Sequence, residues 1–556
     1  MSATVTITCQ TTQREYQVPM GSTLSQVESI IRHQTPYPTL AAYVNNRIRE
    51  MHFRLYEPST IRFLDISSYG GFRVYQRTLS FVLQRAAEEL FAGQTLHIRQ
   101  SLGLGGLYCE VEGVEAFTSE QAALLSGKMR EIVERNLPIT DERVATSKAC
   151  EIYEKRGYHD KVQLLKTRPR LYTQIYHLDG CVGYLYGALA PSTGYVPIFE
   201  IEPCCRGFAL LLPSKETPEV VVKARSDKMF DLFNDYQRWV DVLGLPTVGC
   251  LNDRVLSGDS AEIIRIAEAL HEKLLSRMAD AIVEASNRRG ARLILLSGPS
   301  SSGKTTTSKR LGIHLKVMGF SPVLISMDDY FVNRDQTPRD KDGNYDFEAL
   351  EAVDVEQFNA DVKSLFAGES VDIPRYDFIS GTRQWHEKPL TLDDDAVLIV
   401  EGIHALNPGL TPHIDEALKF KIYASCITTM SMDSTNRIST TDNRLLRRLT
   451  RDFRTRGCSA QMTLERWASV RRGEELHIFP YQGEADFIFN TSLLYEISVL
   501  RSYVEPILRE VSDTQAEYDN ARRLLKFLDN FTPISIEEIP STSIIREFIG
   551  GSGFSY

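Results

Sequence analysis

Three patterns of apolar and polar residues follow one another along the chain. Val5, Ile7 and Cys9 alternate with threonines, which is the period of a half-buried strand. In residues 263–282 apolar side chains recur at spacings of three and four, so we expect a long helix that Gly290 ends. Later, the runs ARLILLSG and AVLIVEG are apolar and end in glycine, as buried parallel strands do. This order predicts a small β-rich unit, a helical region, and then alternating strands and helices.

These patterns predict a multidomain α/β protein. At roughly 150 residues per domain its 556 residues suggest three or four domains, and a single core rarely exceeds about 300 residues. We expect a β-grasp unit, an α+β domain with a helix over 78–90, a helical connector, a domain with a doubly wound parallel sheet, and a helical tail. The corresponding residues are 1–66, 67–225, 226–289, 290–510 and 511–556.

Composition and charge narrow the class of protein. Apolar residues make up 42% and charged residues 24%, which is typical of globular chains and excludes a disordered or fibrous one. The net charge of −10 argues against a nucleic-acid coat or a polybasic membrane binder, although local basic patches stay open. Nine cysteines without a CxxC pair favour free thiols in a reducing compartment. Without a leader pattern or an apolar span of about 18 residues, the sequence predicts a cytoplasmic protein with no membrane partner.

The segment GPSSSGKT at 298–305 fits the phosphate-loop pattern GxxxxGK[ST]. It follows an apolar strand and precedes a helical pattern at 306–317, which is the context that the motif requires. Backbone N–H groups of such a loop close around a phosphate, and the helix start adds its positive dipole end. Lys304 can bridge the β- and γ-phosphates, and the Thr305 hydroxyl can bind Mg²⁺. We therefore expect ATP and Mg²⁺ as cofactors, with nucleotide contacts from Gly298, Ser300, Ser301, Ser302, Gly303, Lys304, Thr305 and Thr306.

Acidic residues stand at the ends of two predicted strands. Glu401 follows the strand 396–400 and can hold Mg²⁺, the alternative being a solvated loop acid. Asp328 and Asp329 follow a strand over 322–326, and strand ends line the ligand crevice of a doubly wound sheet. A carboxylate there can accept the proton of an attacking hydroxyl, typically worth about 10²–10⁴-fold in rate. Because adjacent side chains cannot both point inward, we expect one catalytic and one structural Asp.

An arginine-rich stretch follows the predicted strands. Residues 436–458 contain seven Arg and two Asp, a local net charge of +5 in an acidic protein. Four of these arginines fall on one face of a helix: 444, 447, 448 and 451. A solvated basic helix or an RNA-binding face would look the same. Beside a phosphate loop, however, a lid that clamps ATP phosphates is favoured.

Together these elements resemble the uridine kinase and phosphoribulokinase family of P-loop kinases over about residues 292–500. The pieces that carry the resemblance, in chain order, are GPSSSGKTT, ISMDDYF, NYDFEALEAVD, IPRYDF, VLIVEGIHAL, RRLTRDFRTRG and ADFIFNTS. The resemblance implies Asp328 as general base, Asp346 and Arg448 as ligands of substrate hydroxyls, Tyr376 as a wall of the substrate pocket, and Arg451 and Arg456 as contacts of ATP phosphates. Lys304 and Arg451 join Asp328 in the implied catalytic set.

Two departures from the family pattern bear on the acceptor. Uridine kinases usually carry a His shortly after the YDF of IPxYDF, and the matching stretch here is Ile379-Ser380-Gly381-Thr382. The lid arginine usually found after RG is Cys458. Both departures leave pyrimidine specificity open without affecting the kinase chemistry.

The front half resembles parts of threonyl-tRNA synthetases. Residues 1–66 resemble a TGS domain, and 67–225 resemble the editing, or second additional, domain through TLSFVLQRAAEEL and the PSTG turn at 191–194. The editing site of that family needs an HxxxH pair and a later Cys and His. The matching positions hold Arg77, Phe81 and about Leu185 and Leu189, so we expect no deacylation.

The leading hypothesis is an ATP-dependent kinase that transfers the γ-phosphate to a hydroxyl of a nucleoside (uridine- or cytidine-like) or related polyol. The alternatives are a tRNA-binding regulator that uses the kinase domain as an ATP switch and a phosphoribulokinase-like sugar kinase. A tRNA contact through the front half and a homo-oligomer stay open. The segment SIIREFIGG at 543–551 also matches bacterial chains with this domain order, but its role is not evident.

Overall fold

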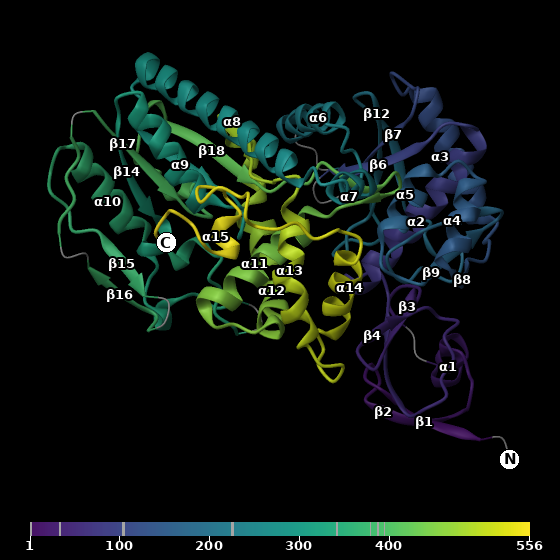
Figure 1. The fold of residues 1–556 in the computed structure, drawn as a ribbon. Helices are drawn as coiled ribbons and strands as arrows, with labels where there is room; N and C mark the ends of the chain where they lie inside the picture. Colours follow the sequence, from purple (N-terminus) through teal and green to yellow (C-terminus); the bar gives the residue numbers. More distant parts are fainter. Residues whose placement is uncertain are drawn as a thin grey trace.

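The computed structural model describes residues 3–32, 35–102, 106–223, 227–340, 343–377, 380–385, 388–393 and 395–556 (Figure 1). The expected boundary at 225/226 and Ile379 lie outside the described residues. The β-rich, helical and α/β regions follow one another in the order that the apolar pattern predicts.

A five-stranded sheet with one helix forms the N-terminal part. Its strand order is β2-β1-β5-β3-β4, with β1 and β5 parallel and the other pairs antiparallel, so the expected β-grasp is confirmed. Helix α1 begins with a capping box in which the Thr23 and Gln26 side chains each accept the other's backbone N–H. The bounds are β1 Thr4–Cys9, β2 Arg14–Pro19, α1 Leu24–Ile31, β3 Ala41–Val44, β4 Arg47–Arg49 and β5 Ser59–Leu64.

The second part packs helices against two antiparallel sheets, β11-β12-β7-β6 and β10-β9-β8. Its long helix α2 begins at Tyr69, nine residues before the expected start at Thr78, because the Ser68 hydroxyl caps it by accepting from Gly71 N. The bounds are α2 Tyr69–Leu90, β6 Leu96–Ser101, β7 Gly106–Val111, α3 Ser119–Glu134, β8 Thr140–Ala145, α4 Thr146–Glu154, α5 His159–Thr167, β9 Tyr172–Leu178, β10 Cys181–Gly183, β11 Glu200–Cys204 and β12 Gly207–Leu211.

The positions that match the editing motif serve the packing of this part. Phe81 is fully buried against Gly183, where an added Cβ would lie 2.7 Å from its ring. Leu185 and Leu189 belong to the same apolar core. Arg77 donates from Nε and Nη2 to the Ala188 carbonyl, at 3.2 and 2.9 Å. These side chains do not form a metal-ligand set.

Three helices connect the front half to the last sheet: α6 (Asp227–Val242), α7 (Val248–Leu256) and α8 (Ser260–Arg289). Helix α8 covers the predicted 263–282 and ends at Gly290, whose left-handed φ of 75° a side chain would disfavour. A buried ion pair also joins the two halves, because Lys161 Nζ on α5 lies 2.7 Å from Asp433 Oδ1 and both side chains are fully buried.

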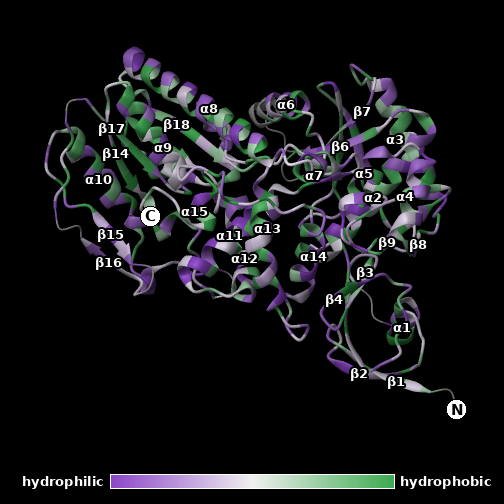
Figure 2. Ribbon diagram, viewed as in Figure 1, coloured by the Kyte–Doolittle hydropathy of each residue, from purple (hydrophilic) through white to green (hydrophobic). Residues whose placement is uncertain are grey.

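The last sheet is parallel, with strand order β14-β17-β13-β18-β21. Along β13, Ile294 and Leu296 face the core under α9, whereas Leu293 and Leu295 face the core under α10. Helices therefore cover both faces, the strands are among the most apolar segments (Figure 2), and the predicted doubly wound parallel sheet is confirmed. The bounds are β13 Leu293–Ser297, α9 Lys304–Val317, β14 Ser321–Ser326, α10 Val355–Phe366, β17 Ala396–Glu401, β18 Lys419–Ser425 and β21 Phe487–Asn490.

The remaining elements surround this sheet. They are the hairpin β15 (Pro374–Asp377) and β16 (Thr382–Trp385), the short pair β19 (Ser431–Asp433) and β20 (Asn436–Arg437), and the helices α11 (Thr440–Arg456), α12 (Ala460–His477), α13 (Glu496–Arg509), α14 (Tyr518–Leu528) and α15 (Arg546–Ile549). Helix α14 packs on α13 and reaches β4, where Ile48 N donates to Asp519 Oδ1 at 2.9 Å. The C-terminus lies beside α9 and α15 (Figure 1). Among the described residues, no helix is long and apolar enough to cross a bilayer.

Candidate active site

The loop from β13 to α9 has a backbone that only its glycines allow. At Gly298 an added Cβ would lie 2.1 Å from the Ala424 carbonyl oxygen. Gly303 has φ 85°, and a Cβ there would meet Ile544 at 2.8 Å. Helix α9 begins directly afterwards, at Lys304, so the strand-loop-helix context expected of a phosphate loop is confirmed.

The polar groups of this loop suit an anion. Lys304 Nζ folds over the loop and donates to the carbonyls of Gly298 and Pro299, at 2.9 and 3.3 Å. The hydroxyls of Ser301 and Ser302 are buried and have no hydrogen-bond partner among the described residues. Buried hydroxyls are normally paired, so two orphaned ones beside a helix N-terminus leave room for phosphate oxygens.

The Thr305 hydroxyl and the Glu401 carboxylate lie together at the carboxyl edge of the sheet. Thr305 Oγ1 donates to Glu401 Oε1 at 2.9 Å. Burial raises the pKa of Glu401 to about 7, against the opposing charge of Lys304. Hydroxyl and carboxylate oxygens are the ligands that Mg²⁺ takes, so this pair fits the predicted metal site.

Asp328 and Asp329 lie in a short 3₁₀ turn, Met327–Tyr330, directly after β14. The Asp329 carboxylate accepts from Tyr376 N on β15, at 3.3 Å. In the described part of the chain, the Asp328 carboxylate makes no hydrogen bond or ion pair. Its charge instead acts on Glu401, whose pKa it helps to raise. The two neighbours thus face different surroundings, and the assignment of one as catalytic and one as structural stays a prediction.

The arginines of α11 divide into two groups. Arg444 and Arg447 are buried, and they form ion pairs with Glu474 and Glu496. Both also donate to the phosphate loop, Arg444 to the Ser300 carbonyl at 3.1 Å and Arg447 to the Ser301 carbonyl at 3.5 Å. Arg444 and Arg447 therefore contact the phosphate loop from the protein interior, whereas a lid would cover the phosphates from the outside.

Three other arginines of α11 contact the phosphate loop or the Asp452 carboxylate. Arg448 Nη1 donates to Ser300 Oγ at 2.8 Å. Arg451 donates to Asp452 from Nε and Nη2, at 2.9 and 2.8 Å, and Arg456 lies 3.7 Å from the same carboxylate. Positive charge is thus concentrated around Asp452 at this end of α11.

The residues expected to contact the acceptor lie at separate points around the site. Arg448 is at the phosphate loop, which places it on the phosphate side. Tyr376 is 6% exposed, and its ring packs on Phe331 with centroids 5.6 Å apart. Asp346 Oδ1 accepts from Glu348 N at 3.1 Å, so this carboxylate shapes its own loop.

Sequence reasoning missed two acidic residues of the site. Glu474 Oε1 on α12 accepts from Ser300 N of the phosphate loop at 3.2 Å. Burial, and next Glu474, raise the pKa of Glu348 to about 7, while Arg448 and Lys304 oppose this shift. Glu348 lies within the quoted segment NYDFEALEAVD, so a local signal existed. Glu474 lies 174 residues from Ser300 and had none.

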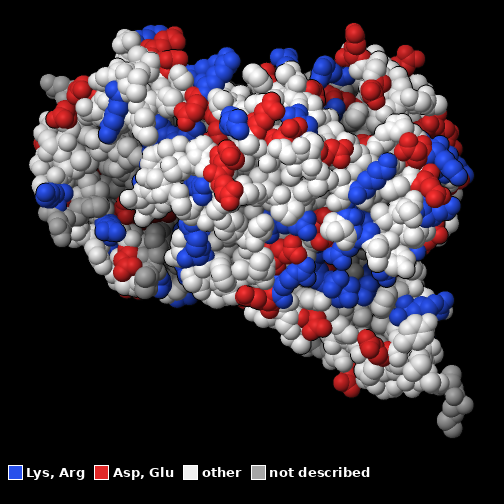
Figure 3. All heavy atoms as spheres, viewed as in Figure 1, with Lys and Arg blue, Asp and Glu red and all other residues white. Residues whose placement is uncertain are grey.

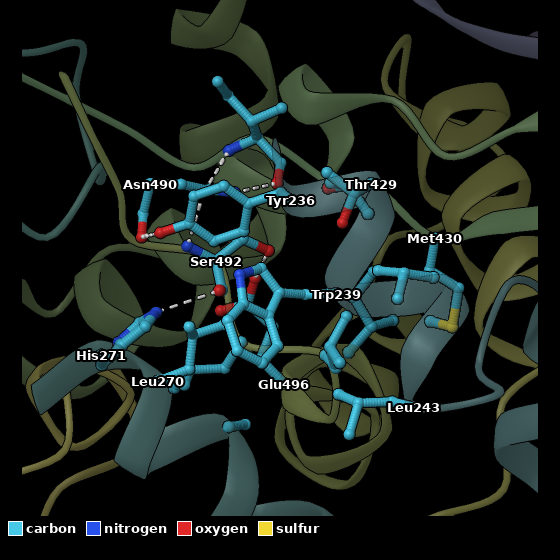
Figure 4. Close-up of a pocket in the computed structure, with 17 residues that line it drawn as sticks. Tyr236, Trp239, Leu243, Leu270, His271, Thr429, Met430, Asn490, Ser492 and Glu496 are labelled. Atoms are coloured by element: carbon cyan, nitrogen blue, oxygen red, sulfur yellow. Dashed lines mark hydrogen bonds between the residues drawn. The ribbon is translucent and has the colours of Figure 1, made fainter. Parts of the chain in front are cut away.

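An enclosed pocket behind β21 is distinct from this site (Figure 4). Tyr236 and Trp239 from α6, His271 from α8 and Glu496 from α13 line it. The cavity measures about 30 Å³, whereas ligand pockets typically measure about 300–1,000 Å³. This volume is too small for a nucleoside or a nucleotide.

A parallel doubly wound sheet with a phosphate loop defines a P-loop nucleotide-binding protein. A sequence profile described as "Phosphoribulokinase / Uridine kinase family" matches residues 293–494. A uridine kinase from Staphylococcus aureus is 30% identical over 199 residues, which are 35% of this chain and 86% of that kinase. The chain therefore belongs to the phosphoribulokinase/uridine kinase family.

Other similarities cover different shares of the chain. A threonine–tRNA ligase from Bacillus subtilis is 25% identical over 188 residues, which are 33% of this chain but only 29% of the ligase. This similarity supports the TGS and editing-like assignment of the front half. A solved structure of a Bacillus stearothermophilus protein, described as a possible uridine kinase, has a TM-score of 0.27 and 21% identity, and the alignment covers 39% of this chain and 98% of that one.

Proposed function

We propose that this protein is an ATP-dependent kinase that phosphorylates a hydroxyl of a nucleoside or a related polyol. The observation that carries the proposal is the convergence of Lys304, Thr305, Glu401 and Asp328 at one edge of the parallel sheet. Phosphoryl transfer needs a phosphate-binding lysine, ligands for Mg²⁺ and a carboxylate that can accept a proton. These four residues supply all three, and the Asp328 carboxylate has no partner in the described chain. The proposed reaction consumes ATP, which suits a cytoplasmic enzyme.

In the proposed mechanism, each group has one task. Lys304 and the backbone N–H groups of the phosphate loop bind the β- and γ-phosphates. Thr305 and Glu401 would hold Mg²⁺, which neutralises phosphate charge. Asp328 accepts the proton of the acceptor hydroxyl at a carboxylate oxygen, the hydroxyl oxygen bonds to the γ-phosphorus, and the bond to the departing ADP oxygen breaks. Arg451 and Arg456 supply positive charge to the transferring group.

The acceptor side of the proposal rests on Asp346 and Tyr376, because Arg448 lies at the phosphate loop. A nucleoside or polyol presents neighbouring hydroxyls, and a carboxylate can hold them by accepting their hydrogen bonds. Because Ser380 and Gly381 stand in the stretch where uridine kinases usually carry a His, we propose a nucleoside without commitment to a pyrimidine. A sugar phosphate of the phosphoribulokinase type is the alternative.

The test is a screen of acceptors. Purified protein is incubated with Mg²⁺, ATP and a panel of nucleosides, polyols and sugar phosphates, and ADP release is measured. We expect one class to stimulate ADP release, and Lys304→Ala to abolish it while the circular dichroism spectrum and melting curve stay unchanged. No stimulation by any acceptor, or unchanged turnover in Lys304→Ala, would contradict the proposal.

A basic surface supports a second function, the binding of RNA. The junction patch comprises nine cations from β4, α2, β20, α14 and the loop before β9: Arg47, Arg49, Arg73, Arg77, Arg170, Arg437, Arg522, Arg523 and Lys526. Figure 3 shows blue side chains gathered over α14 and the neighbouring β4. The carboxylates among these cations are Glu50, Asp442, Asp519 and Asp529, so the patch is net positive in a protein of charge −10.

The cations of the junction patch repel one another. Burial, and next Arg49 and Arg522, lower the pKa of Arg47. Burial and then Arg73 lower the pKa of Arg77 to about 10. Within the described chain, Arg47, Arg77 and Arg522 have no ion pair. Uncompensated cations of this density suit the phosphate backbone of a nucleic acid.

RNA binding is measured by fluorescence anisotropy of a labelled transfer RNA transcript. The patch variant Arg47→Glu/Arg522→Glu/Lys526→Glu should weaken binding at least tenfold, and the slope of log affinity against log salt should shrink by about two to three. The control Arg265→Glu/Arg277→Glu/Arg288→Glu makes the same charge change on the exposed face of α8 and should bind like the wild type. Equal loss in both variants, or no binding by the wild type at low salt, would exclude the junction patch as an RNA site.

A further inference from the structure

Residues 543–556, here called the strap, cross the start of helix α9. Ile544, Ile545 and Phe548 are fully buried in the core of the last sheet. Ile544 lies against the phosphate-loop Gly303, and the Arg447 guanidinium lies 5.0 Å from the centre of the Phe548 ring. The strap is therefore anchored beside the phosphate loop and is not a loose tail.

From this anchored backbone, Glu547 reaches the first turn of α9. Its Oε2 accepts from Thr306 Oγ1 at 2.6 Å and from Thr306 N at 3.3 Å. The Tyr556 hydroxyl lies 2.9 Å from the same Thr306 Oγ1. Two groups of the strap thus occupy a residue of the expected nucleotide contacts.

The first-turn N–H groups of a helix have no partner within the helix, and in a phosphate loop they bind phosphate oxygens. The Glu547 carboxylate is an anion bound at such a group. A nucleotide phosphate and the Glu547 carboxylate cannot share Thr306 without strong repulsion.

We propose that the strap is a built-in competitor of the nucleotide: the Glu547 carboxylate holds Thr306 until a nucleotide phosphate displaces it. The proposal rests on the proposed function in one respect, namely that the start of α9 binds nucleotide phosphate. It gives the SIIREFIGG segment, which the sequence alone left without a role, a task in controlling access to the site.

The strap is built so that part of it can move while its anchors stay. Gly550 and Gly551 follow α15 with φ of 94° and 68°, which other residues adopt only with strain. Residues 553, 555 and 556 beyond them are exposed. Arg454 Nη2 donates to the Glu547 carbonyl at 3.2 Å and so links the strap to the arginine helix α11. Displacement therefore needs a rotation of the Glu547 side chain and of the exposed end, with the buried isoleucines left in place.

Calorimetric titration with ATP tests the competition. Glu547→Gln keeps an acceptor for Thr306 but removes the charge, so ATP should bind about tenfold more tightly. Glu538→Gln is the matched control, because Glu538 is exposed on the same stretch of chain and its loss should leave the affinity unchanged. Adenosine, which lacks phosphates, should bind both variants and the wild type alike. Melting curves establish that the variants are folded.

The outcomes separate this proposal from the proposed function. If the wild type binds ATP in a manner that requires Lys304 but Glu547→Gln binds no more tightly, the strap is not a competitor and the kinase assignment stands. If the wild type does not bind ATP, or if Lys304→Ala binds ATP as tightly as the wild type, both the strap proposal and the kinase proposal are wrong. As a second measurement, saturating ATP should increase hydrogen exchange of the amides at 550–553, and unchanged exchange would show that the strap does not move.

Discussion

At the residue scale, the neighbours Asp328 and Asp329 have different contacts, and we propose different tasks for them. The Asp329 carboxylate is bound to the backbone of β15, while Asp328 acts on Glu401. Asp328→Asn keeps the shape of the side chain but cannot accept a proton. It should lower kcat by roughly 10²–10⁴-fold with little change in ATP affinity.

Asp329→Asn is the comparison, measured over a series of Mg²⁺ concentrations with the acceptor found in the screen. Asp329→Asn should lower kcat much less than Asp328→Asn does. If Asp329 also helps to bind Mg²⁺, its loss of activity should become smaller as the Mg²⁺ concentration is raised. If Asp329→Asn is inactive at every Mg²⁺ concentration while Asp328→Asn is near wild type, the base is Asp329.

The raised pKa of Glu401 leads to a prediction about pH. Its pKa lies at about 7, above the ordinary 4.5, so the buried carboxyl is protonated in mild acid. Metal binding needs the ionised form, and Mg²⁺ affinity should therefore rise about tenfold per pH unit up to about 7 and then level off. Without metal, the stability of the fold depends on pH in the opposite direction. Protonation of Glu401 favours the folded state, so the free energy of unfolding falls as pH rises towards 7.

Titration of Mg²⁺ between pH 5.5 and pH 8.5, followed by the activation of ADP release, checks this dependence. Glu348→Gln serves as control, because burial also raises the pKa of Glu348 to about 7 but, among the described residues, no hydrogen bond joins it to Thr305. The control should keep the pH dependence, whereas Glu401→Gln should lose it along with most of the Mg²⁺ affinity. A wild-type affinity that is flat across this range would refute the assignment of Glu401.

At the scale of elements, helix α11 combines arginines that hold the phosphate loop with arginines that we propose act on the phosphates. Arg447 is buried in an ion pair with Glu496 and also donates to the Thr491 carbonyl at 2.7 Å. Arg447→Met leaves a buried carboxylate without its partner, which typically costs about 3–5 kcal/mol of folding free energy. Urea unfolding should show this loss, and Arg447→Met/Glu496→Met should recover much of it.

Arg451 provides the contrast on the same helix. Arg451→Met should unfold at nearly the wild-type urea concentration but turn over more slowly. Its side chain is not fully buried, and in the described chain its ion-pair partner is Asp452 on the same helix. Equal destabilisation by the two substitutions would show that both arginines are structural.

The same helix shows what local sequence can and cannot predict. The phosphate loop lies within eight consecutive residues, and the strands around it are continuous apolar runs, so both could be predicted. Arginine spacing predicted the helix and its basic face, but it could not show which arginines are buried. Their partners Glu474 and Glu496 lie 30 and 49 residues away on other helices. Likewise, Glu547 lies 241 residues from Thr306, and only the folded chain brings them together.

At the scale of the whole molecule, the buried pair Lys161–Asp433 joins helix α5 of the front half to strand β19 of the second half. Lys161→Met keeps the length of the side chain but leaves the buried Asp433 carboxylate without its ion-pair partner. We therefore expect the free energy of unfolding to fall by about 3–5 kcal/mol. Scanning calorimetry should show the front half melting separately and earlier. Lys148→Met removes an exposed lysine from an ion pair with Glu151 and should change stability by less than about 0.5 kcal/mol. A variant Lys161→Met that melts like the wild type would show that other contacts hold the halves together.

The contact between β4 and α14 joins segments that are made far apart in time. The Ile48 N–H on β4 donates to the Asp519 carboxylate on α14 across 471 residues of chain. At about 5–20 residues per second, a ribosome needs roughly 25–90 s to travel that distance. During this interval the β-grasp unit can fold, but its two basic residues on β4 still lack their neighbours on α14. The junction patch therefore forms only after α14 has been synthesised. Before that, the nascent chain carries separate parts of the patch.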